Sequence, residues 1–282
     1  MKVKTVNFSH NNAAELFSNS LKETGFCVLE NHPLSSRLIN DIYNEWRDFL
    51  ESGEADKYMF NPETQDGYFP KKISEVAKGF KIKDIKHYYH LYFPWGRYPD
   101  EVSSLAREYY KQVFNLGKTL LAWIEDYMDE RVKAKLTRSL VDSLSYERTL
   151  LRIMQYPPLT GNEESGAIRA AAHEDINLIT LLPVASEPGL EVYSLSEKKW
   201  SPVICGEGDL VINIGDMLQE MTAGEYISTS HRVVNPTGGA AKKDRISMPT
   251  FMHAKKDVYL SEKYPTADSY LQERLKELGV KN

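Results

Sequence analysis

Several features that define other protein classes are scarce in this sequence of 282 residues. Only two cysteines occur, Cys27 and Cys205, which excludes a disulfide framework and favours a reducing, cytoplasmic compartment. There is no run of about 18 apolar residues, so no membrane-spanning helix is expected. The first six residues lack the apolar core of a secretory signal peptide.

Positive charge is also in short supply. The net charge is −5, and the basic clusters, such as Lys242-Lys243, are two residues long. Binding to nucleic acid or to an anionic membrane needs a basic face, so neither is expected as a partner. A charged fraction of 27% and a mean hydropathy of −0.47 indicate a soluble globular protein. The length is sufficient for a large buried core.

The first 146 residues are predicted to be mostly helical. One helix begins at Asn11 or Asn12 and ends near Gly25, and a second begins at Ser35 or Ser36 and ends near Gly53. A long helix is expected from about residue 99 to 128 and a shorter one over 131–143. A short strand over 26–29 lies between the first two helices, and residues 54–98 are expected to be irregular.

The second half changes to short β runs separated by turn residues. This spacing favours a sandwich or jelly roll. The predicted helices have broad apolar faces that must pack against a sheet. We therefore expect one domain over 1–282, with a core at 147–254 and a C-terminal segment at 255–282. The β runs are predicted at 149–156, 168–183, 189–194, 199–204, 209–214, 228–235 and 245–253.

The most informative motif lies in one of these runs. His173 and Asp175 are separated by one residue, so on a strand both side chains point to the same side while Glu174 faces away. His231 follows in another strand-like run, which can neighbour the first in a jelly roll. Two histidines and one carboxylate form the facial triad typical of non-haem Fe(II) oxygenases, which leaves open metal positions.

A second motif predicts an anion site. Arg245 and Ser247 share one face of the next strand. A guanidinium beside a hydroxyl is a good receptor for a carboxylate, because the planar fork binds it bidentately. One chamber would therefore hold a metal with open positions and a carboxylate anchor.

In this order, these motifs resemble the iron- and 2-oxoglutarate-dependent oxygenases related to isopenicillin N synthase, over nearly the whole chain. The segments that carry the resemblance, besides the metal triplet, are Gly25 to His32, Gln155-Tyr156-Pro157-Pro158, Asn213-Ile214-Gly215-Asp216, His231-Arg232-Val233 and Arg245-Ile246-Ser247. The resemblance implies a mainly β fold: a double-stranded β-helix (jelly roll, cupin-like) core with a helical N-terminal layer.

The resemblance also implies roles for single residues. His173, Asp175 and His231 would bind Fe(II), and Arg245 and Ser247 would hold the distal carboxylate of 2-oxoglutarate. Tyr156 would assist them through its hydroxyl. Turnover would consume O2, with ascorbate as an additional reductant, and release succinate and CO2. The expected reaction is hydroxylation, desaturation or ring closure at a C–H bond of a small molecule.

Some positions depart from the family pattern. Met154 stands where many relatives have asparagine, two residues before the tyrosine. The interval from His231 to Arg245 is longer than in many relatives and predicts an extended hairpin loop. Asn213 and Asp216 could orient the metal ligands, but a turn-forming role is the favoured interpretation because Gly and Asp favour tight turns.

Candidate substrate contacts are Arg152, Arg169, Tyr68 and Phe251. The two arginines share strand parity with the predicted site residues, and the aromatic residues lie in segments 58–70, 87–96 and 251–259 that are expected to line the pocket. Three alternatives stay open at this point. They are a jelly roll that binds metal and keto acid without turnover, a family member that does not use 2-oxoglutarate (including ethylene-forming chemistry), and a cupin-like enzyme that holds zinc or manganese.

Overall fold

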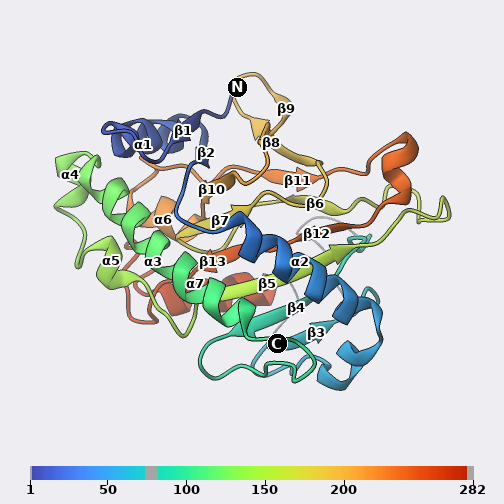
Figure 1. Cartoon of the computed structure of the whole chain (residues 1–282). Helices are drawn as coiled ribbons and strands as arrows, with labels where there is room; N and C mark the ends of the chain where they lie inside the picture. The colour runs from blue at the N-terminus through green and yellow to red at the C-terminus, as the bar shows by residue number, and fades with distance from the viewer. Residues whose placement is uncertain (1, 74–81, 278–282) are drawn as a thin grey trace.

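The computed structural model describes residues 2–73 and 82–277. Within these ranges the chain forms two facing β-sheets, and helices pack on the outer side of the larger sheet (Figure 1). The expected fold, a jelly-roll core with a helical layer, is confirmed. None of the helices in the described ranges is long and apolar enough to cross a membrane.

The helical layer consists mainly of α1 (Ala13–Thr24), α2 (Ser36–Glu51) and α3 (Leu105–Asp126). The predicted starts and stops of α1 and α2 are confirmed. Gly25 ends α1 with a φ of 72°, and the Ser35 side chain caps α2 by accepting from the Leu38 N–H. The long helix begins at Leu105 rather than at residue 99. Short helical turns complete the layer: η1 (Glu54–Tyr58), α4 (Glu130–Lys133) and α5 (Leu140–Ser143).

The larger sheet has nine strands among the described residues, and all its neighbours pair antiparallel except β1 with β2. It runs in the order β1-β2-β10-β7-β13-β5-β4-β3, and β12 also pairs with β5. The strand bounds are β1 Thr5–Asn7, β2 Phe26–Glu30, β3 Gly67–Phe69, β4 His87–Tyr92, β5 Leu150–Tyr156, β7 Ile179–Pro183, β10 Leu210–Ile214, β12 Arg245–Ser247 and β13 Thr250–Met252.

The smaller sheet has the order β6-β11-β8-β9, with bounds Ala170–His173, His231–Val233, Leu190–Ser194 and Lys199–Pro202 respectively. Apolar side chains of both sheets meet between them. Met154 and Tyr156 of the larger sheet pack with Ala170 and Val233 of the smaller one. The main core lies on the other side, between the larger sheet and the helices.

The expectation of irregular structure over 54–98 is wrong, because these residues include η1, β3 and β4. Residues 74–81 of that stretch lie outside the described residues. The run 168–183 divides into β6 and β7, and the extended hairpin loop contains the 3-10 turn η2 (Gly238–Lys242). Two further helices were not predicted, α6 (Asp216–Met221) and α7 (Ala267–Glu277). The domain bounds stay a prediction, although strands from the first 146 residues join the same sheet as β5.

Candidate metal centre and adjoining cavity

Two histidines and a carboxylate meet at the end of the smaller sheet. His173 is the last residue of β6 and lies directly opposite His231, the first residue of β11. Their ring centroids are 4.4 Å apart. Asp175 follows β6, and its Oδ1 lies 3.8 Å from Nε2 of His173 and 3.7 Å from Nε2 of His231. The three ligand atoms lie within 4.8 Å of one another, so the cluster could hold a metal ion.

The backbone orients both imidazoles toward this centre. Nδ1 of His173 donates to the Ala171 carbonyl (2.7 Å) and Nδ1 of His231 to the Thr229 carbonyl (3.2 Å). Because a carbonyl can only accept, the proton is on Nδ1 and the Nε2 lone pair faces the centre. Burial, followed by the neighbouring His231 imidazole, lowers the pKa of His173 to about 4. The donor set, two neutral nitrogens and a carboxylate oxygen, fits a transition metal with open positions.

Asp175 is held by two side chains of the larger sheet. Its Oδ2 accepts from Asn213 Nδ2 (2.8 Å) and from the Thr180 hydroxyl, and these two residues face each other across β10 and β7. Burial raises the pKa of Asp175, but the histidines and these donors outweigh it and hold the pKa below its usual value. Oδ1 therefore remains available to coordinate a metal ion. The turn-forming interpretation of Asn213 is wrong, because Asn213 lies in β10 and positions a ligand.

Gly215 and Asp216 fix the backbone beside this carboxylate. A Cβ on Gly215 would lie 2.3 Å from the Asn177 carbonyl oxygen, so no larger residue fits where the two segments approach. The Asp216 N–H donates to the Asp175 carbonyl (2.7 Å), and the Asp216 carboxylate accepts from Tyr270 of α7 (2.7 Å). Asp216, the first residue of α6, therefore helps to hold the backbone of Asp175 in place.

The predicted anion site is buried between the two sheets. Arg245 and Ser247 of β12 are each 3% exposed and pair with Tyr156 and Met154 of β5. Arg245 donates from Nε to the Glu187 carbonyl (2.9 Å), while its buried Nη1 has no partner. A guanidinium that has an unbonded Nη1 and lies beside a hydroxyl can bind a carboxylate. Met154, which departs from the family pattern, accepts the Tyr156 hydroxyl at its sulfur (2.9 Å).

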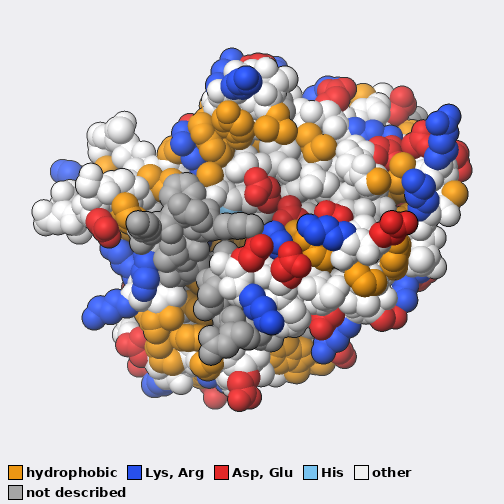
Figure 2. Space-filling view, turned by 180° about the vertical axis from the view of Figure 1, so that it is seen from behind, with side chains coloured by type: hydrophobic (Ala, Val, Ile, Leu, Met, Phe, Trp, Pro, Cys, Tyr) orange, Lys and Arg blue, Asp and Glu red, His pale blue; other side chains and the backbone are white. Residues whose placement is uncertain are grey.

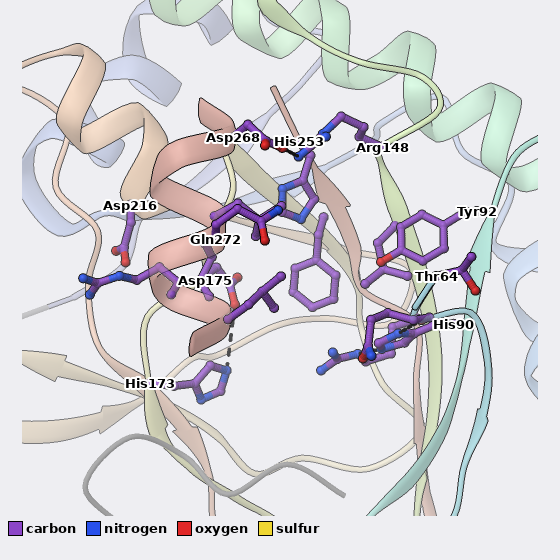
Figure 3. A pocket seen from close by; sticks show the side chains of 18 of the residues that line it. Thr64, His90, Tyr92, Arg148, His173, Asp175, Asp216, His253, Asp268 and Gln272 are labelled. Atoms are coloured by element: carbon purple, nitrogen blue, oxygen red, sulfur yellow. Dashed lines mark hydrogen bonds and ion pairs between the residues drawn. The ribbon is translucent and has the colours of Figure 1, made fainter. Parts of the chain in front are cut away.

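A cavity of about 750 Å³ reaches His173 and Asp175 (Figure 3). Two of the predicted substrate residues line it, Arg152 and Phe251. The Arg152 guanidinium lies 5.3 Å from the Phe251 ring centroid, and Arg152 Nε bonds His90 Nε2 (2.8 Å). The three segments expected to shape the pocket all contribute. Their lining residues are Glu63, Thr64, Gln65, His90, Tyr92, Trp95, Phe251, His253 and Lys256.

The other two predicted substrate residues are not among the described residues that line this cavity. Tyr68 pairs with Tyr89 in a register that turns both toward α2, and its hydroxyl bonds His87 Nδ1 (3.0 Å). A neighbouring position on a strand faces the opposite side, and Phe69 accordingly packs between the sheets. Arg169 is fully buried and reaches the Lys243 carbonyl instead.

The sequence interpretation missed the wall that α7 provides. Leu271, Gln272 and Leu275 of this helix line the cavity, and Asp268 pairs with Arg148, another lining residue, at 3.2 Å. Ala267, Tyr270 and Leu271 recur at helical spacing, a signal that could have revealed α7. His253 lies in the same wall, and burial lowers its pKa to about 4, so it is neutral near pH 7.

Comparison with known proteins agrees with this geometry. Residues 146–254 match the model of the 2OG-Fe(II) oxygenase superfamily, and residues 5–115 match that of the non-haem dioxygenase N-terminal region named for morphine synthesis. A putative oxygenase from Shewanella oneidensis is 50% identical over the full length of both chains, with a TM-score of 0.88.

More distant relatives extend this result. The 2-oxoglutarate-dependent dioxygenase thnC of Trichoderma harzianum is 28% identical over 86% of this chain and 78% of its own. A full-length Neurospora crassa protein, solved in complex with alpha-KG and thymine, shares the fold with a TM-score of 0.78 at 21% identity, over 97% of this chain and 96% of that one.

Proposed function

Because the chain belongs to the 2OG-Fe(II) oxygenase superfamily, a family of non-haem iron dioxygenases, we propose that it oxidises a C–H bond of a small molecule held in the 750 Å³ cavity. The outcome would be hydroxylation, desaturation or ring closure. The observation that carries the proposal is the convergence of His173, Asp175 and His231 at the end of that cavity.

The residues divide into two groups of binding side chains. His173, Asp175 and His231 would hold Fe(II), and Arg245, Ser247 and Tyr156 would hold the distal carboxylate of 2-oxoglutarate. When bound, the iron supplies the redox chemistry that couples C–H oxidation to the conversion of 2-oxoglutarate and O2 into succinate and CO2. Hydroxylation places the second oxygen atom of O2 in the product; desaturation or ring closure releases it as water.

The protein's own contribution is orientation and enclosure. Asn213 and Thr180 hold Oδ2 of Asp175, which keeps Oδ1 on the metal side. The anion site is buried between the sheets, so its hydrogen bonds act away from water. Ala170 and Val233, which pack against Tyr156, lie on the strands that carry His173 and His231. The anchor on β5 and β12 therefore packs against the same two strands that carry the metal histidines.

The cavity wall supports a small, partly aromatic substrate. The volume of the cavity is in the range of ordinary small-molecule sites. Phe251, Tyr92 and Trp95 offer aromatic faces, and Arg152 and the neutral His253 offer polar contacts. The Neurospora relative was solved with thymine, a small ring compound, in addition to alpha-KG. The cytoplasmic location stays a prediction.

The test is succinate formation in the presence of Fe(II), 2-oxoglutarate, O2 and a panel of small aromatic and heterocyclic compounds. A substrate should raise succinate release, and Asp175→Ala should reduce it by roughly a hundredfold or more because the ligand set is incomplete. Asp41→Ala, which removes an exposed carboxylate of α2, is the matched control and should leave the rate unchanged. Unchanged succinate release by the Asp175 variant would contradict the ligand assignment.

A further inference from the structure

Arg169 is a fully buried arginine that has no role in the function proposed above. Its side chain is 0% exposed and ranks among the largest fully buried side chains of the described residues. Nη2 donates to the Lys243 carbonyl (2.8 Å), but the buried Nε and Nη1 have no hydrogen-bond partner. Arginine stays charged in proteins, and a buried charge without a counterion is costly. A bound anion would neutralise this charge and accept the unbonded N–H groups.

The fold places this guanidinium next to that of Arg245. Lys243, whose carbonyl Arg169 binds, lies two residues before Arg245 in the segment that leads into β12. Burial, followed by the positive charge of Arg245, lowers the pKa of Arg169, which indicates that the two cations are close. The Arg169 backbone is held as well, because its N–H donates to Asn235 Oδ1 (2.9 Å) just beyond β11.

No protein carboxylate in the described ranges, residues 2–73 and 82–277, forms an ion pair with either of the two arginines. Asp244 and Glu187 raise the pKa of Arg169 by their charge, but both carboxylates are bonded to other residues. Asp244 accepts from Arg47 (2.8 Å) and Gln155 (3.2 Å), and the Glu187 carboxylate pairs with Lys243 (3.0 Å). Arg169 and Arg245 together thus present three buried, unpartnered N–H-bearing nitrogens and two positive charges.

We propose that Arg169 is a second anchor for the distal carboxylate of the keto-acid cosubstrate, so that two guanidiniums from opposite sheets bind this carboxylate. Arg245 reaches it from the larger sheet and Arg169 from the segment that leads into β6 of the smaller one. The inference rests on the proposed function. It adds a specificity consequence, because a 2-oxo acid without a distal carboxylate would leave both cations buried and unpaired.

Binding rather than turnover tests this. The Zn(II)-loaded protein, which has no redox chemistry, is titrated with 2-oxoglutarate and separately with pyruvate, a 2-oxo acid that lacks the distal carboxylate. Arg169→Met is expected to weaken 2-oxoglutarate binding by roughly tenfold or more, as for the loss of a hydrogen bond to a charged group. Pyruvate binding should change by less than about threefold, because it makes no contact at the anchor.

Two variants separate anchoring from support of the fold. Arg138→Met removes an arginine that pairs with the exposed Asp257, and it should leave both affinities unchanged. Arg169→Gln keeps a donor for the Lys243 carbonyl but loses the charge; it should show the same selective loss, and it replaces Arg169→Met if that variant does not fold. An equal change for both acids, or no change for either, would overturn the inference. A wild-type protein that binds neither acid would contradict the proposed function itself, and the anchor with it.

Discussion

At the scale of single residues, the metal centre depends on side chains that do not touch the metal. Asn213 is 2% exposed, and its amide donates to the Asp175 oxygen that faces away from the histidines. If that bond is lost, only the Thr180 hydroxyl still holds Oδ2, so Oδ1 is held less firmly toward the centre. Partners of this kind matter for metal affinity almost as much as the ligands do.

Asn213→Ala is therefore expected to weaken Fe(II) binding by about 10- to 100-fold. The measurement is an anaerobic competition titration against a chelator of known affinity, with circular dichroism to verify the fold. Asn162→Ala, in the exposed loop after β5, is the matched control and should bind Fe(II) like the wild type. Wild-type affinity in the Asn213 variant would show that the Asn213 amide is not needed to orient Asp175.

The HxD spacing predicts the ligand cluster correctly, although β6 ends at His173 and Asp175 reaches the cluster from the segment that follows the strand. The turn interpretation of Asn213 fails because a local rule describes Gly215-Asp216, whereas the partner of Asn213 comes from a segment 38 residues earlier. The prediction that Arg169 enters the substrate pocket rests on parity alone. Parity gives the face of a strand, but the direction of a long side chain depends on what it meets there, here the Lys243 carbonyl.

At the scale of elements, the helices with clear caps and apolar stripes were predictable, and the strands between aromatic-rich loops were not. α2 carries its own start signal in Ser35 and a stripe of buried residues at helical spacing. β3 pairs with β4, and β4 is hydrogen-bonded to β5, which lies about 60 residues later in the sequence. Their pairing is thus a tertiary interaction, and a local pattern of tyrosines, histidines and prolines does not reveal it.

One ion pair ties these strands into the cavity wall. Asp66, which precedes β3 and follows the lining residues Thr64 and Gln65, accepts from the Arg97 N–H and from Arg97 Nε (both 2.9 Å). Burial raises the pKa of Asp66, but the hydrogen bonds from Arg97 and Thr64 outweigh it and lower the pKa below its usual value. A lowered pKa contributes stability above the unfolded-state value of about 3.9, and this is lost as the pH falls through the folded value.

Asp66→Asn should accordingly cost about 1–2 kcal/mol of unfolding free energy near pH 7, from weakened hydrogen bonds to a partly exposed arginine. The difference from wild type should shrink as the pH falls below about 4, because Asp66 is protonated first in the unfolded chain and then, at lower pH, in the folded protein. Urea unfolding at a series of pH values measures it. Asp41→Asn, on the exposed side of α2, should show no such dependence. A difference that stays constant down to about pH 3 would disprove the ionic contribution.

At the scale of the whole molecule, the site is assembled from distant parts of the chain. β4 contributes His90 from the first half, β6 and β11 supply the metal ligands, and α7 closes the cavity from the C-terminal end. On the face shown in Figure 2, acidic and basic side chains are interspersed, with no broad area of one charge. The residues of the candidate site lie instead in the interior, where Asp175, His231, Arg245 and Ser247 are buried.

A ligand that bridges the sheets should stabilise the entire fold. Zn(II) and 2-oxoglutarate, each present at about 100 times its dissociation constant, should each add roughly 2.7 kcal/mol to the unfolding free energy. Thermal melting with the metal, with both ligands and with a chelator measures this, and the chelator should return the melting temperature to that of the metal-free protein. Asp175→Ala should gain far less from Zn(II). An equal gain by this variant would place the metal elsewhere.

The most direct test of the account is an anaerobic visible spectrum of the metal-free protein with Fe(II), before and after addition of 2-oxoglutarate. A new metal-to-ligand charge-transfer band is expected when the keto acid chelates iron held by His173, Asp175 and His231. No new band, with iron shown to be bound, would contradict the claim that these residues and Arg245 together form an iron and 2-oxoglutarate site.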